Sequence, residues 1–148
     1  MARFEFRLQT LRRLREIHRD EQRGRLATAF EAERILQSQR DALAAEAAEH
    51  LQSQRRAMRE GLLDVNRMLT TQRYQLALEA QAKVLAEQAA RLAEEVDRRR
   101  AALVEADREV KVLDQLEERQ RAQHRVAALR AETKLLDEVA SNRWEASD

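Results

Sequence analysis

The complete absence of proline from a chain of 148 residues constrains this fold more than any other feature. Proline removes a backbone hydrogen-bond donor and breaks helices, so no residue of this kind limits helix length here. Glycine, the next strongest helix breaker, occurs only at Gly24 and Gly61. Alanine, leucine, glutamate and arginine dominate instead, a composition typical of coiled coils and long helices. The sequence therefore predicts an all-α protein.

The composition also argues against a compact hydrophobic core. Only 3% of the residues are aromatic, and 37% are charged. Most of the hydrophobic residues are alanine or leucine, which favour helix, although each alanine buries little apolar area. Apolar surface of this kind suits a narrow stripe along a helix rather than the interior of a globule.

A seven-residue repeat of apolar positions runs through the second half of the chain. This 3.5-residue spacing is typical of a helix that packs against a partner helix in a coiled coil. Beyond Leu113 the apolar residues leave the register, which predicts a stutter that locally relaxes the supercoil. The predicted seam consists of Leu78, Ala82, Leu85, Ala89, Leu92, Val96, Arg99, Leu103, Ala106, Val110 and Leu113.

The first half of the chain has a weaker apolar pattern. An opening stripe is followed by residues 18–25, which are nearly all polar, and the pattern resumes at Leu36 and Leu43. A lone helix with such gaps is marginal in water, so we expect this half to share the seam of a partner helix. The opening stripe consists of Phe4, Leu8, Leu11, Leu14 and Ile17.

The chain can provide that partner itself if it reverses direction near its middle. Gly61 suits the left-handed position that ends a helix, and Asp64 or Asn66 suits the N-cap of the next helix. These residues predict an antiparallel hairpin of two long helices, in which each helix supplies the seam of the other.

The predicted organisation is a single elongated coiled-coil domain over residues 1–148. We expect helix one at about 3–60, a turn at about 60–67 and helix two at about 67–143. One alternative is a later turn at Thr70–Thr71. Another is one uninterrupted helix that pairs with a second copy of the chain.

A turn in this position makes the second helix longer than the first. The second helix then extends past its partner by about 20 residues, at a rise of about 1.5 Å per residue. An apolar stripe without an internal partner indicates an external one. The residues expected in this extension include Leu129, Leu135, Leu136, Val139 and Trp144.

No catalytic or metal-binding motif is present in the sequence. His18, His50 and His124 lie far apart and lack the i, i+4 spacing of metal ligands on a helix. Cysteine is absent, which excludes thiolate ligands and disulfides. A glycine-rich phosphate loop and a nucleophile elbow are also lacking. We therefore expect a protein that is not an enzyme and has no catalytic residues, metal or cofactor.

The charge pattern bears on nucleic-acid and membrane binding. Residues 1–25 contain eight arginines against four acidic residues, but alternating acids offset arginine clusters along the chain and no aromatic platform accompanies them. We expect no nucleic-acid partner. Phe4 and Phe6 among these arginines are compatible with binding to a membrane surface. The preferred prediction is that the apolar residues of this segment pack against a partner helix. No apolar run approaches the roughly 20 residues of a membrane-spanning helix, which predicts a cytoplasmic protein without an integral membrane segment.

Two stretches of the chain resemble a known family. The start reads FEFRLQTLRRLREIHRDEQ, and residues 98–125 read RRRAALVEADREVKVLDQLEERQRAQHR. Both are similar to characteristic segments of the flagellar FliJ family. Tyr74 and the LLDEVA sequence at 135–140 also fall where members of that family often have similar residues. The resemblance covers nearly the whole chain.

This resemblance implies a soluble component of the flagellar type III export apparatus, built as a helical hairpin similar to the stalk of rotary ATPases. In the family, the end that holds both termini inserts into the hexameric export ATPase. The other end reaches toward the cytoplasmic domain of the membrane export gate. Family members also escort export chaperones, which implies a cytoplasmic location with peripheral association at the cell membrane.

The resemblance also implies two sets of contact residues. Those expected to bind the ATPase are Phe4, Arg7, Leu11, Arg12, Arg15, Arg119, Gln120, Gln123 and Val126. Those expected to bind the export gate are Met58, Leu62, Leu69 and Tyr74. Because Arg12 and Arg15 are expected outside the core, their replacement by glutamate should weaken ATPase stimulation and leave the helical content unchanged.

Two other functions fit the same architecture. A stalk protein of a virulence-type secretion system would have the same fold, and its genomic neighbourhood would identify it. A dimeric or filamentous structural coiled coil would instead form its seam between chains. Its mass would grow with concentration, whereas a hairpin is expected to be an elongated monomer.

Overall fold

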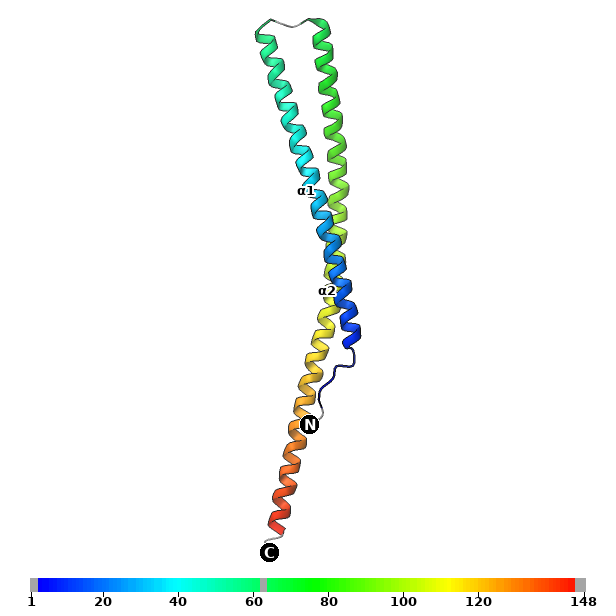
Figure 1. Ribbon diagram of the computed structural model, residues 1–148, viewed down its shortest axis with the longest axis vertical. Coiled ribbons are helices and arrows are strands. Elements are labelled where there is room, and N and C mark those ends of the chain that lie inside the picture. The colour runs from blue at the N-terminus through cyan, green and yellow to red at the C-terminus, as the bar shows by residue number, and fades with distance from the viewer. Residues whose placement is uncertain (1–2, 62–63, 146–148) are drawn as a thin grey trace. The chain divides into compact units, whose positions relative to one another are not determined.

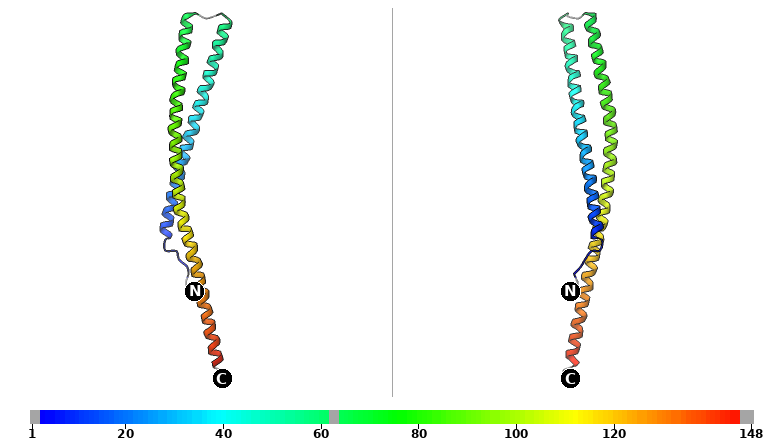
Figure 2. Two further views of the ribbon diagram at one scale, coloured as in Figure 1. Left: turned by 180° about the vertical axis from the view of Figure 1, so that it is seen from behind. Right: turned by 45° about the vertical axis from the view of Figure 1, so that its right-hand side comes forward.

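A computed structural model describes residues 3–61 and 64–145 of the chain. It contains two helices, α1 (Gln9–Arg59) and α2 (Val65–Glu145), and no strand in the described ranges (Figure 1). The helices run in opposite directions, which the further views in Figure 2 also show. The predicted fold class, an all-α antiparallel helical hairpin, is confirmed. The alternative of one uninterrupted helix is wrong, because the chain reverses between α1 and α2.

The contacts of the chain divide into two compact units, each built from parts of both helices. We call residues 1–21 with 104–148 the terminal unit and residues 22–103 the turn unit. In the terminal unit, Arg12 and Arg15 of α1 contact Glu117 and Glu109 of α2. The pairing is antiparallel, because the partner's number falls as the number along α1 rises.

Gly61 and Asp64, two capping residues that the sequence indicated, lie at the end of α1 and at the start of α2. Gly61 has a φ of 66°, and its amide lies 3.4 Å from the Met58 carbonyl oxygen. At the start of α2, Asp64 Oδ1 accepts a 2.6 Å hydrogen bond from the backbone amide of Arg67, which is N-cap geometry. Thr70 and Thr71 lie within α2, so the later turn is wrong. Glycine tolerates the left-handed conformation that ends α1 without steric cost.

Replacing each glycine by alanine should have opposite effects on stability. Gly61→Ala places a side chain at positive φ and is expected to cost about 1 kcal/mol. Gly24→Ala lies inside α1, where no heavy atom outside its local helix lies within 4 Å of an added Cβ. The Gly24→Ala substitution is expected to raise the free energy of unfolding by roughly 0.5–1 kcal/mol. Urea denaturation followed by circular dichroism measures both, and equal shifts of the same sign would contradict the capping role of Gly61.

The seam predicted on α2 is largely confirmed. Buried seam residues occur in both units, with Leu78 and Val96 in the turn unit and Ala106, Val110 and Leu113 in the terminal unit. Leu85, Ala89, Leu92, Arg99 and Leu103 are half-buried, whereas Ala82 is exposed. The 3.5-residue period thus identified the face of α2 that contacts α1.

Arg99 shows how a charged residue occupies this seam. Its Nη1 donates a 2.5 Å hydrogen bond to the backbone carbonyl of Arg25 on α1, and its Nε donates to Glu95 at 2.7 Å. The guanidinium therefore satisfies polar groups on both helices, and the residue is half-buried at this seam position.

The opening stripe of the first half is more exposed than the prediction of a seam implies, although its first residue, Phe4, is half-buried. Leu11, Leu14 and Ile17 are 38%, 58% and 50% exposed. Helix α1 begins at Gln9 rather than near residue 3. Residues 3–8 are irregular, and Phe6 among them is buried. In this unit, Arg12 and Arg15 of α1 add ion pairs to carboxylates of α2 beside the buried apolar residues of the α2 seam.

The C-terminal part of α2, residues 126–144, is exposed at every position except the half-buried Ala128. Its large apolar side chains are all exposed. In the described ranges, neither helix contains a stretch that is both long and apolar enough to cross a membrane. The exposed residues are Val126, Leu129, Leu135, Leu136, Val139 and Trp144.

Candidate protein-interaction surfaces

An ionic cluster around Arg12 joins the two helices of the terminal unit. Arg12 Nη1 donates a 2.5 Å hydrogen bond to Glu117 Oε2, and its Nε lies 2.9 Å from Asp114 Oδ1. The Nε–Asp114 pair is too poorly aligned to count as a hydrogen bond, so that contact is electrostatic. Glu117 has a side chain only 14% exposed and also accepts from Arg121 at 2.8 Å. Arg12 is therefore part of the contact between α1 and α2.

This geometry corrects the expectation that Arg12 lies outside the core, whereas Arg15 is exposed. Arg12 is partly buried between two carboxylates of α2. Arg15 Nη1 donates to Glu109 Oε2 at 2.9 Å, also across the two helices. The sequence pattern missed these pairs because a count of apolar positions ignores arginines that bridge to acids on another helix. A glutamate at position 12 would perturb the structure as well as any binding surface.

Phe4 contacts α2 through its aromatic ring. The ring centroids of Phe4 and His124 are 5.7 Å apart, and the Arg121 guanidinium carbon lies 5.6 Å from the Phe4 centroid, a cation–π distance. Phe6 is buried and Phe4 half-buried, so neither ring offers the exposed aromatic surface that a membrane reading requires. Arg121 and His124 also belong to this cluster, although no pattern in the sequence indicates them.

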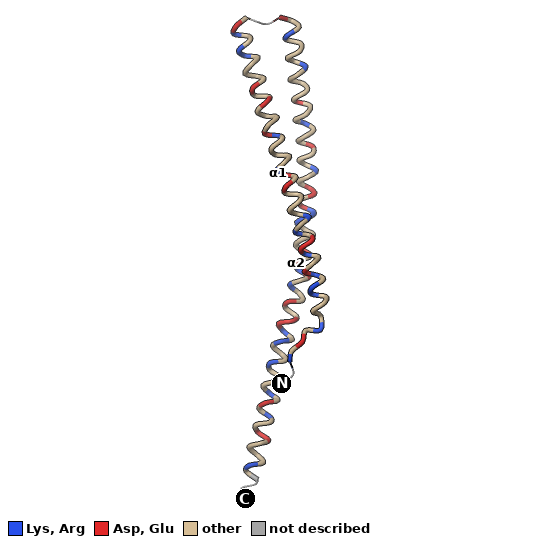
Figure 3. The backbone as a smooth tube through the Cα atoms, in the orientation of Figure 1, with Lys and Arg blue, Asp and Glu red and all other residues tan. Residues whose placement is uncertain are grey.

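The segments predicted to bind the ATPase belong to one compact unit. Residues 4–15 and 119–126 all lie in the terminal unit. Arg7, Leu11, Arg119, Gln123 and Val126 are exposed there, whereas Gln120 is half-buried. Basic and acidic residues alternate along this part of α2 (Figure 3). We call the five exposed residues Arg7, Leu11, Arg119, Gln123 and Val126 the terminal surface.

The residues predicted to bind the export gate belong to the turn unit. Met58, Leu69 and Tyr74 are exposed, and Leu62 lies outside the described residues. Tyr74 is held by α1: its hydroxyl donates to the Glu46 carboxylate, and its ring centroid lies 4.6 Å from that of His50.

His50 completes this contact from α1. Its Nε2 lies 3.2 Å from the Thr71 carbonyl oxygen, which can only accept a hydrogen bond. Nε2 therefore carries a proton in this arrangement. Together, the Tyr74–Glu46 and His50–Thr71 contacts join the two helices on the turn side of the chain.

The Tyr74 contact predicts a measurable titration. The hydrogen bond to Glu46 raises the pKa of Tyr74 above its ordinary value of 10.0, and partial burial and the charges of Glu46 and Glu49 act in the same direction. Tyr74 is the only tyrosine, so ultraviolet absorbance reports its ionisation alone. We expect the pH midpoint of Tyr74 ionisation to lie above about 10. This midpoint should fall in the Glu46→Gln variant and stay unchanged in the control variant Glu33→Gln.

The sign of the linked stability change follows from this shift. Because the folded state favours neutral Tyr74, the contact stabilises the protein below the unfolded pKa, and this contribution is lost as the pH rises through the folded pKa. An absorbance midpoint at or below the ordinary value in the unmodified protein would contradict the Tyr74–Glu46 contact.

Two antiparallel helices with mixed charge and exposed aliphatic side chains define a helical hairpin protein. Within residues 3–61 and 64–145, no three histidine or acidic side chains come together as metal ligands. Residues 4–148 match the family model described as Flagellar FliJ protein, and the chain belongs to that family. This membership makes it a flagellar export-related protein. No curated protein and no solved structure matches the sequence.

Proposed function

We propose that this chain acts as a non-catalytic coiled-coil stalk and escort in flagellar protein export. It would link the hexameric export ATPase to the cytoplasmic domain of the membrane export gate and also bind export chaperones. Membership in the FliJ family over residues 4–148 is the observation that carries this proposal. The hairpin fold supports it, because a pair of long helices can present separate surfaces to separate partners. The proposed location is the cytoplasm, with peripheral association at the membrane.

The terminal surface is the proposed ATPase contact. Arg7 and Arg119 are exposed and form no ion pair within the part of the chain that the structure describes, so their charges are available to a partner. Arg12, Arg15 and Phe4 contact α2, so we propose that they hold the terminal surface in place. Exposed charges at an interface mainly govern the association rate and its salt dependence.

The turn unit carries the proposed gate contact. Met58, Leu69 and Tyr74 are exposed and come from both helices. Exposed large apolar side chains that gather on one part of a protein indicate an interaction site. The exposed apolar side chains of the C-terminal part of α2 remain available to a further partner, such as an export chaperone.

Stimulation of the export ATPase from the same genome tests this function. The purified chain should accelerate ATP hydrolysis, and Arg7→Glu with Arg119→Glu should weaken the effect at matched concentration. Arg73→Glu with Arg91→Glu, two exposed arginines of the turn unit, is the matched control. Circular dichroism must show equal helical content in both variants. Absence of stimulation by the unmodified chain would overturn the ATPase part of the proposal.

Light scattering in the same experiment separates the rival structural function. A hairpin stalk predicts a monomer, whereas a structural coiled coil predicts a dimer or filament whose mass grows with concentration. A filament without effect on the ATPase would replace the export function by a structural one.

A further inference from the structure

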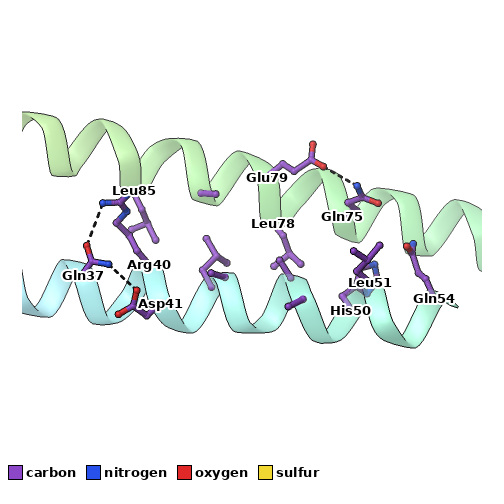
Figure 4. A pocket seen from close by; sticks show the side chains of 15 residues that line it. Gln37, Arg40, Asp41, His50, Leu51, Gln54, Gln75, Leu78, Glu79 and Leu85 are labelled. Atoms are coloured by element: carbon purple, nitrogen blue, oxygen red, sulfur yellow. Dashed lines mark hydrogen bonds between the residues drawn. The ribbon is translucent and has the colours of Figure 1, made fainter. Parts of the chain in front are cut away.

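The turn unit contains a groove between its two helices (Figure 4). Its volume is about 550 Å³, and its lining residues lie within 37–54 of α1 and 75–85 of α2. We call it the alanine groove, because alanines form much of its lining. The residues used below are Ala44, Ala47, Ala48, Leu51, Leu78 and Ala82.

Small side chains leave this space open. Ala44, Ala48 and Ala82 are exposed, so no larger side chain covers them from the opposite helix. Leu78 is buried, whereas Leu51 is 44% exposed at the side of the groove. The apolar lining is thus only partly covered by the hairpin itself, and alanines allow another backbone to approach closely, because the distance between packed helices depends on the side chains at the contact.

Two carboxylates that line the groove form hydrogen bonds to glutamine side chains. Asp41 on α1 accepts a 2.8 Å hydrogen bond from the Gln37 amide, and Glu79 on α2 accepts a 3.0 Å bond from the Gln75 amide (Figure 4). Among the described residues, neither carboxylate has an ion-pair partner, and Arg40, which also lines the groove, donates a 3.5 Å hydrogen bond to Gln37. By contrast, inter-helix carboxylates of the terminal unit are paired with arginines. One carboxylate on each side is therefore available to a cation.

We propose that the alanine groove binds one amphipathic helix of a partner protein, with a small aliphatic face flanked by lysine or arginine. This inference goes beyond the ATPase and gate contacts proposed above. The lining residues span about 25 Å along α1 at 1.5 Å per residue, a length that suits a helix of four to five turns. Apolar anchors would lie on the alanines and Leu51, and flanking cations would meet Asp41 and Glu79.

The C-terminal part of α2 in a second copy of the chain is a poorer occupant of the alanine groove. Residues 126–145 contain three basic and four acidic residues, so a second copy would not bring a basic helix to the acidic side chains of the groove. Charge complementarity therefore favours a different protein over self-association.

A peptide-binding experiment on the full chain tests the proposal. The probe is a fluorescent synthetic amphipathic helix with a leucine–alanine face and lysine flanks, and the comparator has the same face with glutamate flanks. Fluorescence anisotropy should show saturable binding of the lysine peptide that weakens with salt, and at least tenfold weaker binding of the glutamate peptide.

Paired substitutions locate the binding site. Ala44→Gln with Ala82→Gln fills the groove with side chains that helices tolerate, and it should weaken the lysine peptide at least tenfold. Asp41→Asn with Glu79→Gln should weaken it several-fold and reduce the salt dependence. Ala90→Gln, an exposed alanine of α2 outside the groove lining, should leave binding unchanged.

Three outcomes would overturn the inference. Equal binding of the two peptides would remove the charge argument. Unchanged binding in the Ala44→Gln/Ala82→Gln variant would place the peptide elsewhere. A dimer in light scattering that dissociates in that variant would identify a second copy as the occupant.

Discussion

Replacement of Val110 by aspartate is expected to lower the free energy of unfolding by about 3 kcal/mol, the largest effect of any single change considered for this chain. Val110 is only 2% exposed and lies in the terminal unit between α1 and α2. A carboxylate there would lose its hydration without a cation designed to receive it. Urea denaturation followed by circular dichroism measures the loss.

Val112→Asp provides the matched control two residues along the same helix. Val112 is 63% exposed, so the same change introduces the same charge and helix propensity without burying it. We expect a loss within about 0.5 kcal/mol, as for surface substitutions in general. Equal losses for the two variants would show that Val110 is not at the inter-helix contact in solution.

Arg12→Glu should produce the second largest effect, a loss of about 2 kcal/mol, between the values typical of exposed and buried ion pairs. Arg12 lies beside Asp114 and Glu117 of α2 and Glu16 of its own helix. The substitution replaces attraction to these groups by repulsion among carboxylates. Thermal unfolding at low and high salt measures the loss, which should shrink at high salt because the cluster is partly solvent-exposed.

Two comparisons isolate the Arg12 contacts. Arg13→Glu changes the charge of an exposed neighbour that forms no ion pair among the described residues, so it should change stability little. The exchange Arg12→Glu with Glu117→Arg should recover part of the loss, because it restores an opposite-charge pair across the helices. A loss in Arg12→Glu no larger than in Arg13→Glu would contradict the inter-helix role.

The Arg12 result also decides how ATPase data should be interpreted. A drop in ATPase stimulation in Arg12→Glu would combine lost structure with lost contact, since Arg12 joins α1 to α2. Arg7 and Arg119 avoid this problem because they are exposed and unpaired among the described residues. The unfolding measurement on Arg12 should therefore precede any use of that residue to map a partner.

The seam of α2 was predictable because its apolar period is strong. Val96 and Val110 lie at predicted seam positions and are buried. The opposing face of α1 was not predictable in the same way. Leu14 is exposed there, whereas Arg12 lies beside Asp114 and Glu117 of α2, and the apolar pattern of α1 carries no information on these acidic partners. That information lies about one hundred residues away in sequence, outside any local pattern.

The candidate surfaces were predictable to different degrees. The family resemblance supplied the sets that contain Arg7 and Tyr74, and sequence alone supplied the capping residues Gly61 and Asp64. The alanine groove was not predicted, since alanine at positions such as Ala82 was read as seam. Whether an alanine packs or leaves a hollow depends on the distance between helices, which sequence periodicity does not determine.

The exposed C-terminal part of α2 also supplies an internal optical probe. Trp144 is the only tryptophan of the chain and is 79% exposed, so its emission should be that of a solvated indole. A protein that covers this segment would remove water from the ring and shift the emission to shorter wavelength. Ligands that occupy only the alanine groove should leave the spectrum unchanged. Unlabelled protein can thus report which of its surfaces a partner has covered.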